Sequence, residues 1–246
     1  MCSSDLSAAD TPRSEAIDRR DSPLELRFAT FAMSTCAPGL PMGLPERDRE
    51  RRAIVIFRHP CALIASIKHG MLSGAFGHNP SEDYGIFELL VRSNPGRRHR
   101  VTLDNLQMML PIERLAWKWV LLYEKVIEDT EGIDGVSFVR YEDVCLDTKR
   151  STRTMFEFCG LPWNPQTEEF IERSTKLREA GGWNLMRALE SRPGYFSIFK
   201  DPVHSATKWR SQLSLEEIDS VYRVLGSSDL LPLYPRVEEL SVRVQG

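Results

Sequence analysis

Long apolar runs are missing from this chain of 246 residues. No hydrophobic stretch approaches the roughly 18 residues that a membrane-spanning helix needs, so we expect no transmembrane segment. The first 20 residues are rich in serine, aspartate and arginine and lack the apolar centre of a signal peptide.

A strong excess of one charge is also missing, because the net charge is only −3. This balance gives no general attraction to nucleic acid, and any anion site must be built locally. The five cysteines are odd in number, and no pair has the spacing of a metal site, so we expect no metal. Their scatter favours a reducing compartment, and the expected location is the cytoplasm.

Glycine and histidine are absent from the start of the chain, which has no glycine before Gly39 and no histidine before His59. Residues 1–23 show no apolar period and are predicted to be a disordered tail. Residues 24–31 alternate enough to form a strand. We predict a single domain over 24–240.

The most informative stretch runs from Ala53 to Gly70. Its first five residues form an apolar, β-branched run that predicts a buried strand. Pro60 suits the first turn of a helix, because its missing N–H would have no partner there. Gly70 is placed to end that helix. Arg58 therefore stands at the corner between strand and helix.

That corner suits an anion. A helix N-terminus offers N–H donors, and the guanidinium of Arg58 matches the oxygens of a phosphate. The hydroxyl of Ser66, eight residues later, could reach the same anion. The competing interpretation is that Arg58 is a surface charge and Ser66 a small packing residue.

Two further segments carry signals. Apolar residues at three- and four-residue steps predict a helix over 111–129, with its aromatic stripe in the core. A buried strand follows at 136–140 and ends before Tyr141. Glu142 and Asp143 are interpreted as fixing the loop and capping a neighbouring helix.

The last third holds the segment 205–210 and then a helix that begins with a capping box, Ser214 to Glu217. The basic stretch 92–100 is interpreted as a solvated loop. The alternatives were the rim of an acceptor site or a contact for an acidic partner.

Arg58, Pro60 and Ser66 after a buried strand resemble the 3′-phosphate motif of the sulfotransferases, which use 3′-phosphoadenosine 5′-phosphosulfate (PAPS). The strand with Tyr-Glu-Asp at 141–143, the Phe-Cys-Gly-Leu-Pro-Trp end at 158–163, and the Lys-Trp segment at 208–209 resemble the same family. The resemblance implies an α/β fold of the P-loop type, with a central parallel sheet flanked by helices. It also implies a PAPS-dependent enzyme that sulfates a hydroxyl or amine acceptor. The nucleotide-binding residues that it implies are Arg58, Ser66, Tyr141, Ser205, Thr207 and Lys208.

The N-terminal part of that fold is incomplete in this sequence. Nothing before Arg58 resembles the Lys-Ser-Gly-Thr-Thr loop that holds the 5′-phosphosulfate in the family, and no residue stands out as catalytic base. Three explanations were open: a truncated product, a divergent member that only binds nucleotide or a partner, or an unrecognised loop that does the work. A nucleoside kinase was disfavoured, because no glycine-rich Lys-Ser/Thr loop is present.

Overall fold

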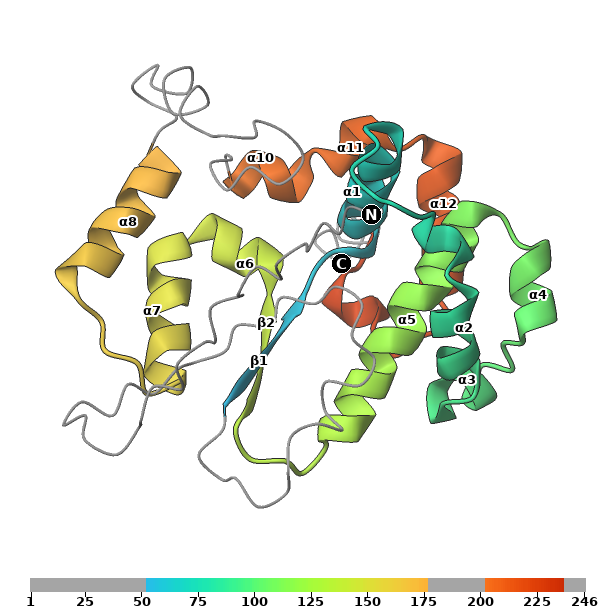
Figure 1. The fold of residues 1–246 in the computed structure, drawn as a ribbon, viewed down its shortest axis with the longest axis horizontal. Coiled ribbons are helices and arrows are strands. Elements are labelled where there is room, and N and C mark those ends of the chain that lie inside the picture. The colour runs from blue at the N-terminus through green and yellow to red at the C-terminus, as the bar shows by residue number, and fades with distance from the viewer. Residues whose placement is uncertain (1–51, 177–201, 237–246) are drawn as a thin grey trace, which may run out of the picture. The chain divides into compact units, whose positions relative to one another are not determined.

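The computed structural model describes residues 52–176 and 202–236. Within these ranges the chain is mostly helical, with a small parallel sheet of two strands (Figure 1). The expected tail at 1–23 and the expected strand at 24–31 lie outside the described residues.

The elements follow one another along the chain as β1 (Ala53–Phe57), α1 (Pro60–Leu72), η2 (Pro80–Glu82), α2 (Tyr84–Val91), α3 (Asn94–Arg98), α4 (Leu103–Met108), α5 (Pro111–Thr130), β2 (Val136–Arg140), α6 (Tyr141–Leu146), α7 (Thr148–Phe158), α8 (Pro165–Lys176), α10 (Pro202–Thr207), α11 (Trp209–Gln212), α12 (Leu215–Leu225) and η3 (Leu231–Leu233).

The two strands have the bounds that the sequence predicts, but they are not the buried strands expected, since of their residues only Phe57 is buried. They pair in parallel with Ala53 opposite Val136 and Phe57 opposite Arg140. Parallel pairing needs a crossover connection, and helices α1 to α5 supply it. Because the strands run in the same direction, their carboxyl ends lie at the same edge of the sheet. Arg58 and Tyr141 follow directly at that edge.

Helix α1 starts at Pro60 as predicted, but it does not end at Gly70. The helix continues to Leu72, and Gly74 beyond it has a φ of 67°. Gly70 is needed for another reason, since a Cβ there would lie 2.3 Å from the Phe76 ring. Because glycine has no side chain, the Phe76 ring can approach the helix closely at Gly70. The pattern of residues around Gly70 does not predict this contact.

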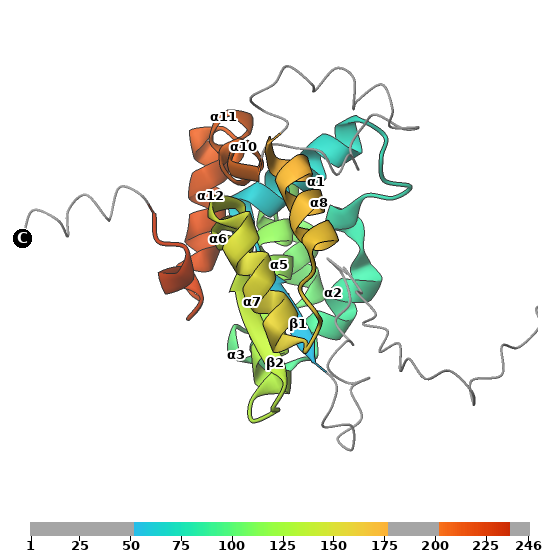
Figure 2. The same cartoon turned by 90° about the vertical axis from the view of Figure 1, so that its left-hand side faces the viewer.

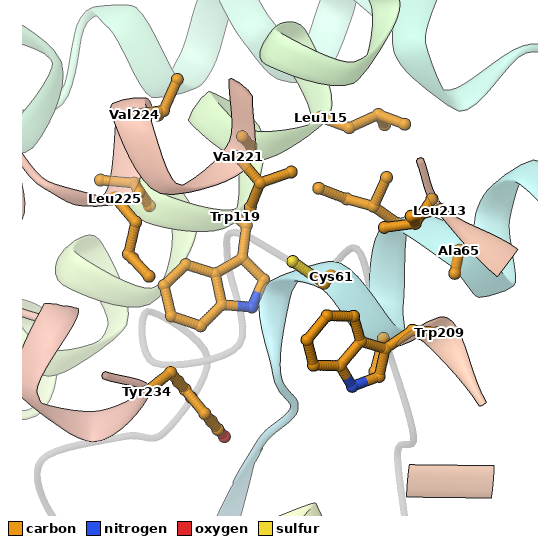
Figure 3. Close-up of a cluster of buried hydrophobic side chains, with 14 of the residues drawn as sticks. Cys61, Ala65, Leu115, Trp119, Trp209, Leu213, Val221, Val224, Leu225 and Tyr234 are labelled. Atoms are coloured by element: carbon orange, nitrogen blue, oxygen red, sulfur yellow. The ribbon is translucent and has the colours of Figure 1, made fainter. Parts of the chain in front are cut away.

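Helix α5 forms the centre of the main core. Its predicted apolar stripe is confirmed, with Trp119 only 2% exposed, and it packs against α1, α12 and Phe57 (Figure 3). Two of its side chains also bond to β1. The indole N–H of Trp119 donates to the Arg58 carbonyl at 2.9 Å, and the Tyr123 hydroxyl donates to the Ile56 carbonyl at 3.0 Å.

Helices lie on both sides of the strand pair. Helices α6, α7 and α8 lie on one side, and α5 with α2, α3 and α4 lies on the other (Figures 1 and 2). On the α5 side, the Phe57 ring stacks with Tyr123 at 4.6 Å between centroids and contacts Phe138. Both observations agree with the α/β class.

The basic stretch 92–100 is solvated, as the sequence indicated, because its four arginines are exposed, but it is not a loop. Most of it forms α3, with Ser93 as N-cap accepting from the Gly96 amide. The Arg98 guanidinium donates to the Glu124 carboxylate at 2.7 Å and also pairs with Glu128. Distant carboxylates on α5 therefore order the stretch, and a local pattern of charges does not reveal them.

Candidate functional site

The candidate site lies at the edge where both strands end. Arg58 follows β1, and Tyr141, which follows β2, is the first residue of α6. The guanidinium carbon of Arg58 lies 5.0 Å from the centre of the Tyr141 ring, which is within the range of a cation–π contact. Two predicted site residues, 83 positions apart in sequence, are thus brought together by the parallel pairing.

The Arg58 guanidinium has an unused donor. Its Nε is buried and has no hydrogen-bond partner. Buried polar groups are almost always paired, so an orphaned guanidinium N–H needs a specific explanation. An anionic ligand with oxygen acceptors would supply the missing partner.

Lys208 adds a second cation to the site. It is the N-cap residue of α11 and is half-buried. Burial lowers the pKa of its ammonium group, and the positive charge of Arg58 acts in the same direction. The chain neighbours of the two cations, His59 and Trp209, stack with their ring centroids 4.4 Å apart. Among the described residues, no carboxylate forms an ion pair with either cation.

Tyr141 has a buried hydroxyl next to the Cys145 thiol. Burial raises the pKa of Tyr141 to about 12, and the hydrogen bond with Cys145 acts in the same direction. The phenol therefore stays neutral, and one side of its ring is taken by Arg58. A nucleobase stacking on Tyr141 would have to use the opposite side of the ring.

The remaining predicted site residues are less directly placed. Ser66 lies in the second turn of α1. Ser205 is buried in α10, a helix that packs against α6 and hence near Tyr141. Thr207 is exposed, and its hydroxyl donates to the Val203 carbonyl, so in this conformation its proton bonds within its own helix.

The N-terminus of α1 offers fewer free donors than the sequence suggests. Pro60 has no N–H, and the amide of Cys61 donates to the His59 ring nitrogen Nδ1 at 3.2 Å. Side-chain cations, more than helix amides, therefore make this corner suitable for an anion.

His59 is the residue that sequence reasoning missed. Its ring stacks on the Trp209 indole with centroids 4.4 Å apart, and its Nε2 lies 3.3 Å from the Tyr222 hydroxyl. Burial and the charges of Arg210 and Arg140 lower the pKa of this imidazole to about 3. A signal was available, because the residue before a helix-starting proline is the natural N-cap position.

Glu142 confirms the structural interpretation made from sequence. One carboxylate oxygen accepts the His59 backbone N–H at 2.9 Å, and the other accepts the Tyr234 hydroxyl at 3.1 Å. The carboxylate thereby ties α6 to the residue that caps α1. Asp143 lies 3.8 Å from the Arg140 guanidinium at the surface.

Within the described ranges, no group of three or more histidine, cysteine or acidic side chains could hold a metal ion. None of the helices described is both long and apolar enough to cross a membrane.

A comparison with curated proteins finds a human protein named carbohydrate sulfotransferase 3. This chain is 28% identical to it over 88 residues. The match spans 36% of this chain but only 16% of the human protein. No family model and no solved structure matches the chain. The similarity gives partial support to the sulfotransferase resemblance that the motifs carry.

Proposed function

We propose that this chain binds PAPS and transfers its sulfuryl group to a hydroxyl or amine acceptor. The observation that carries the proposal is the buried Nε of Arg58, which has no hydrogen-bond partner. A second cation, Lys208, comes from the same region, since its chain neighbour Trp209 stacks on His59, the chain neighbour of Arg58. Neither cation has a carboxylate partner among the described residues. Two neighbouring cations repel unless an anion lies between them, so the arrangement suits a doubly charged group such as the 3′-phosphate of the nucleotide. The human relative's name supports the sulfuryl donor.

Each site residue has a role in this proposal. Arg58 binds the 3′-phosphate through its planar fork, with the hydroxyl of Ser66 as a further donor. Lys208, Ser205 and Thr207 hold the nucleotide from the α10–α11 side. Tyr141 lies at the nucleobase. In the reaction a bond forms between the acceptor atom and sulfur, the sulfur–oxygen bond to the 5′-phosphate breaks, and the electron pair leaves with 3′-phosphoadenosine 5′-phosphate (PAP). The proton of the acceptor is released to water.

A second candidate function is nucleotide binding without catalysis. His59, the histidine next to Arg58, is a poor base because both of its ring nitrogens are engaged and its pKa is about 3. This observation favours a chain that binds PAPS or PAP as a sensor or scaffold.

The test of binding is calorimetry of the full chain with PAP. Arg58→Ala should weaken PAP binding about 10- to 100-fold, because charge-assisted hydrogen bonds are lost. Arg97→Ala is a matched control, since Arg97 is an exposed arginine of α3 that bonds only locally to Asn94, and it should bind PAP like the wild type. Adenosine 5′-phosphate lacks the 3′-phosphate, so Arg58→Ala should hardly change its binding.

Equal binding of PAP by the wild type and by Arg58→Ala would overturn the proposed site. Transfer of radiolabelled sulfate from PAPS to a pool of hydroxyl and amine acceptors then separates the two functions. PAP binding with transfer supports the enzyme, and PAP binding without any transfer supports the second candidate.

A further inference from the structure

The stack between His59 and Trp209 joins two segments that are far apart in sequence. The two rings are inclined by only 22°, with centroids 4.4 Å apart, so they lie nearly face to face. Trp209 is 6% exposed and belongs to the main hydrophobic core (Figure 3). The stack therefore anchors the N-terminus of α11 to the N-terminus of α1.

The chain neighbours of the two stacked rings are the two site cations. Arg58 precedes His59, and Lys208 precedes Trp209. The two cations are therefore attached to backbone segments that the stack joins. Burial of Trp209 provides the free energy that holds the segments together against charge repulsion.

The His59 ring is itself fixed on several sides. Nδ1 accepts from the Cys61 amide, so the ring proton is on Nε2, which can donate to the Tyr222 hydroxyl. The Tyr234 ring contacts its edge at 5.0 Å between centroids. Its backbone N–H donates to Glu142. These contacts leave the imidazole little freedom to turn.

We propose that His59 is a positioning residue that, through its stack with Trp209, sets the spacing of Arg58 and Lys208 and so prepares the anion site before a ligand binds. This inference rests on the proposed nucleotide site, and it adds His59 to the residues that hold that site in shape. Preorganisation of this kind improves affinity because less ordering is left for the binding step.

The charge state of His59 suits this role. The charged groups around it are Arg140 of β2, Arg210 of α11 and Glu142 of α6, and the hydroxyls of Tyr222 and Tyr234 are neutral neighbours. With its pKa lowered to about 3, the imidazole is neutral at physiological pH. The stack between His59 and Trp209 therefore does not add a third positive charge next to Arg58 and Lys208.

The experiment separates the cap of α1 from the stack by using two substitutions. His59→Asn keeps a good N-cap acceptor but loses the ring, and His59→Phe keeps a ring but loses the cap. PAP binding by the full chain is measured calorimetrically for both, and urea unfolding establishes that each variant is folded. We expect His59→Asn to bind PAP about three- to tenfold more weakly and His59→Phe to stay within about twofold.

A double-mutant cycle tests whether the effect passes through Lys208. In a Lys208→Gln background, His59→Asn should cost less than about twofold in PAP affinity, because the cation that the stack positions is gone. If His59 had a purely structural role, His59→Asn would lower PAP affinity by the same factor with and without Lys208. Additive effects, or PAP binding by His59→Asn equal to the wild type, would overturn the inference.

Hydrogen exchange in the ligand-free protein gives a readout that does not depend on the nucleotide. The amides of 208–213 should exchange faster in His59→Asn, while those of α12 stay protected as in the wild type. Wild-type protein that does not bind PAP would overturn the proposed function, whatever the exchange shows. PAP binding with unchanged exchange in His59→Asn would overturn only the role of His59.

Discussion

Two basic regions of this molecule differ in whether carboxylates match their positive charges. The stretch 92–100 is the more basic of the two, yet Arg98 and His99 are matched by the buried carboxylate of Glu124. Arg58 and Lys208 are single basic residues in sequence, and among the described residues they meet no carboxylate. A binding site is therefore better indicated by unmatched charge at the end of a strand than by a run of charges.

The largest expected effect concerns the matched region. Glu124 is 5% exposed and bonds to Arg98, His99 and the Ser228 hydroxyl, so it joins α3, α5 and the turn after α12. Glu124→Ala should lower the free energy of unfolding by about 3 kcal/mol, because its buried polar partners lose their acceptor.

Urea unfolding measures the change, with Glu128→Ala as a control. Glu128 is more exposed, and its loss should cost less than about 1 kcal/mol. PAP affinity of folded Glu124→Ala should match the wild type. Weaker PAP binding in this variant would mean that the two regions are not separate.

The next largest effect is a dependence of folding stability on pH, which arises from His59 beside Arg58. The pKa of His59 is about 3 in the folded protein against an ordinary 6.5, so only the unfolded chain gains a proton between these values. Stability should fall as the pH drops below 6.5, by up to about 1.4 kcal/mol per pH unit. The loss should continue until the pH nears 3.

The measurement compares urea unfolding of wild type and His59→Asn from pH 7 to pH 5. The variant lacks this titrating group, so its stability should depend less steeply on pH. Parallel curves for the two proteins would show that the imidazole is not held neutral by the fold.

The smallest expected effect is a change in the free energy of unfolding when one cation is removed, and its sign should differ between the two regions. Lys208→Gln should raise the stability of the ligand-free protein by about 0.5 kcal/mol, because it removes an unmatched cation beside Arg58. Arg98→Ala should instead lower stability, since it breaks pairs with Glu124 and Glu128. Thermal unfolding at low salt shows both changes, and a loss of stability in Lys208→Gln would contradict the comparison.

Local signals were sufficient for much of the fold. Strands β1 and β2 follow from β-branched runs, α5 from its apolar period, and α12 from the capping box of Ser214 and Glu217, which the structure confirms. These elements depend on residues within a few positions of one another, so the sequence carries the information directly.

Two expectations failed because of side-chain contacts that the residue pattern does not show. Gly70 resembled a helix end, but the Phe76 ring explains it. The basic stretch resembled a loop, but Glu124 orders it. Within the site, Arg58 and Tyr141 could be linked through the strands that they follow, whereas the proximity of Lys208 to Arg58 depends on how α11 packs. Apart from Cys61 on its own helix, the partners of His59 come from four separate elements or turns, and no sequence pattern joins them.

The hydrogen bonds from α5 to β1 have one more consequence. In parallel pairing, the N–H and C=O of one strand residue both face the neighbouring strand, and those of the next residue face the opposite side. The amide of Ala53 bonds to the Gly135 carbonyl next to β2, so Ala53 and every second residue after it face β2. The carbonyls of Ile56 and Arg58 therefore point away from β2, and these are the acceptors that Tyr123 and Trp119 occupy. An open strand edge is a template on which another copy of the chain can add a strand and start to aggregate. Trp119 and Tyr123 occupy two acceptors on the edge of β1 that faces away from β2, so a strand that added there would find these two carbonyls already bonded.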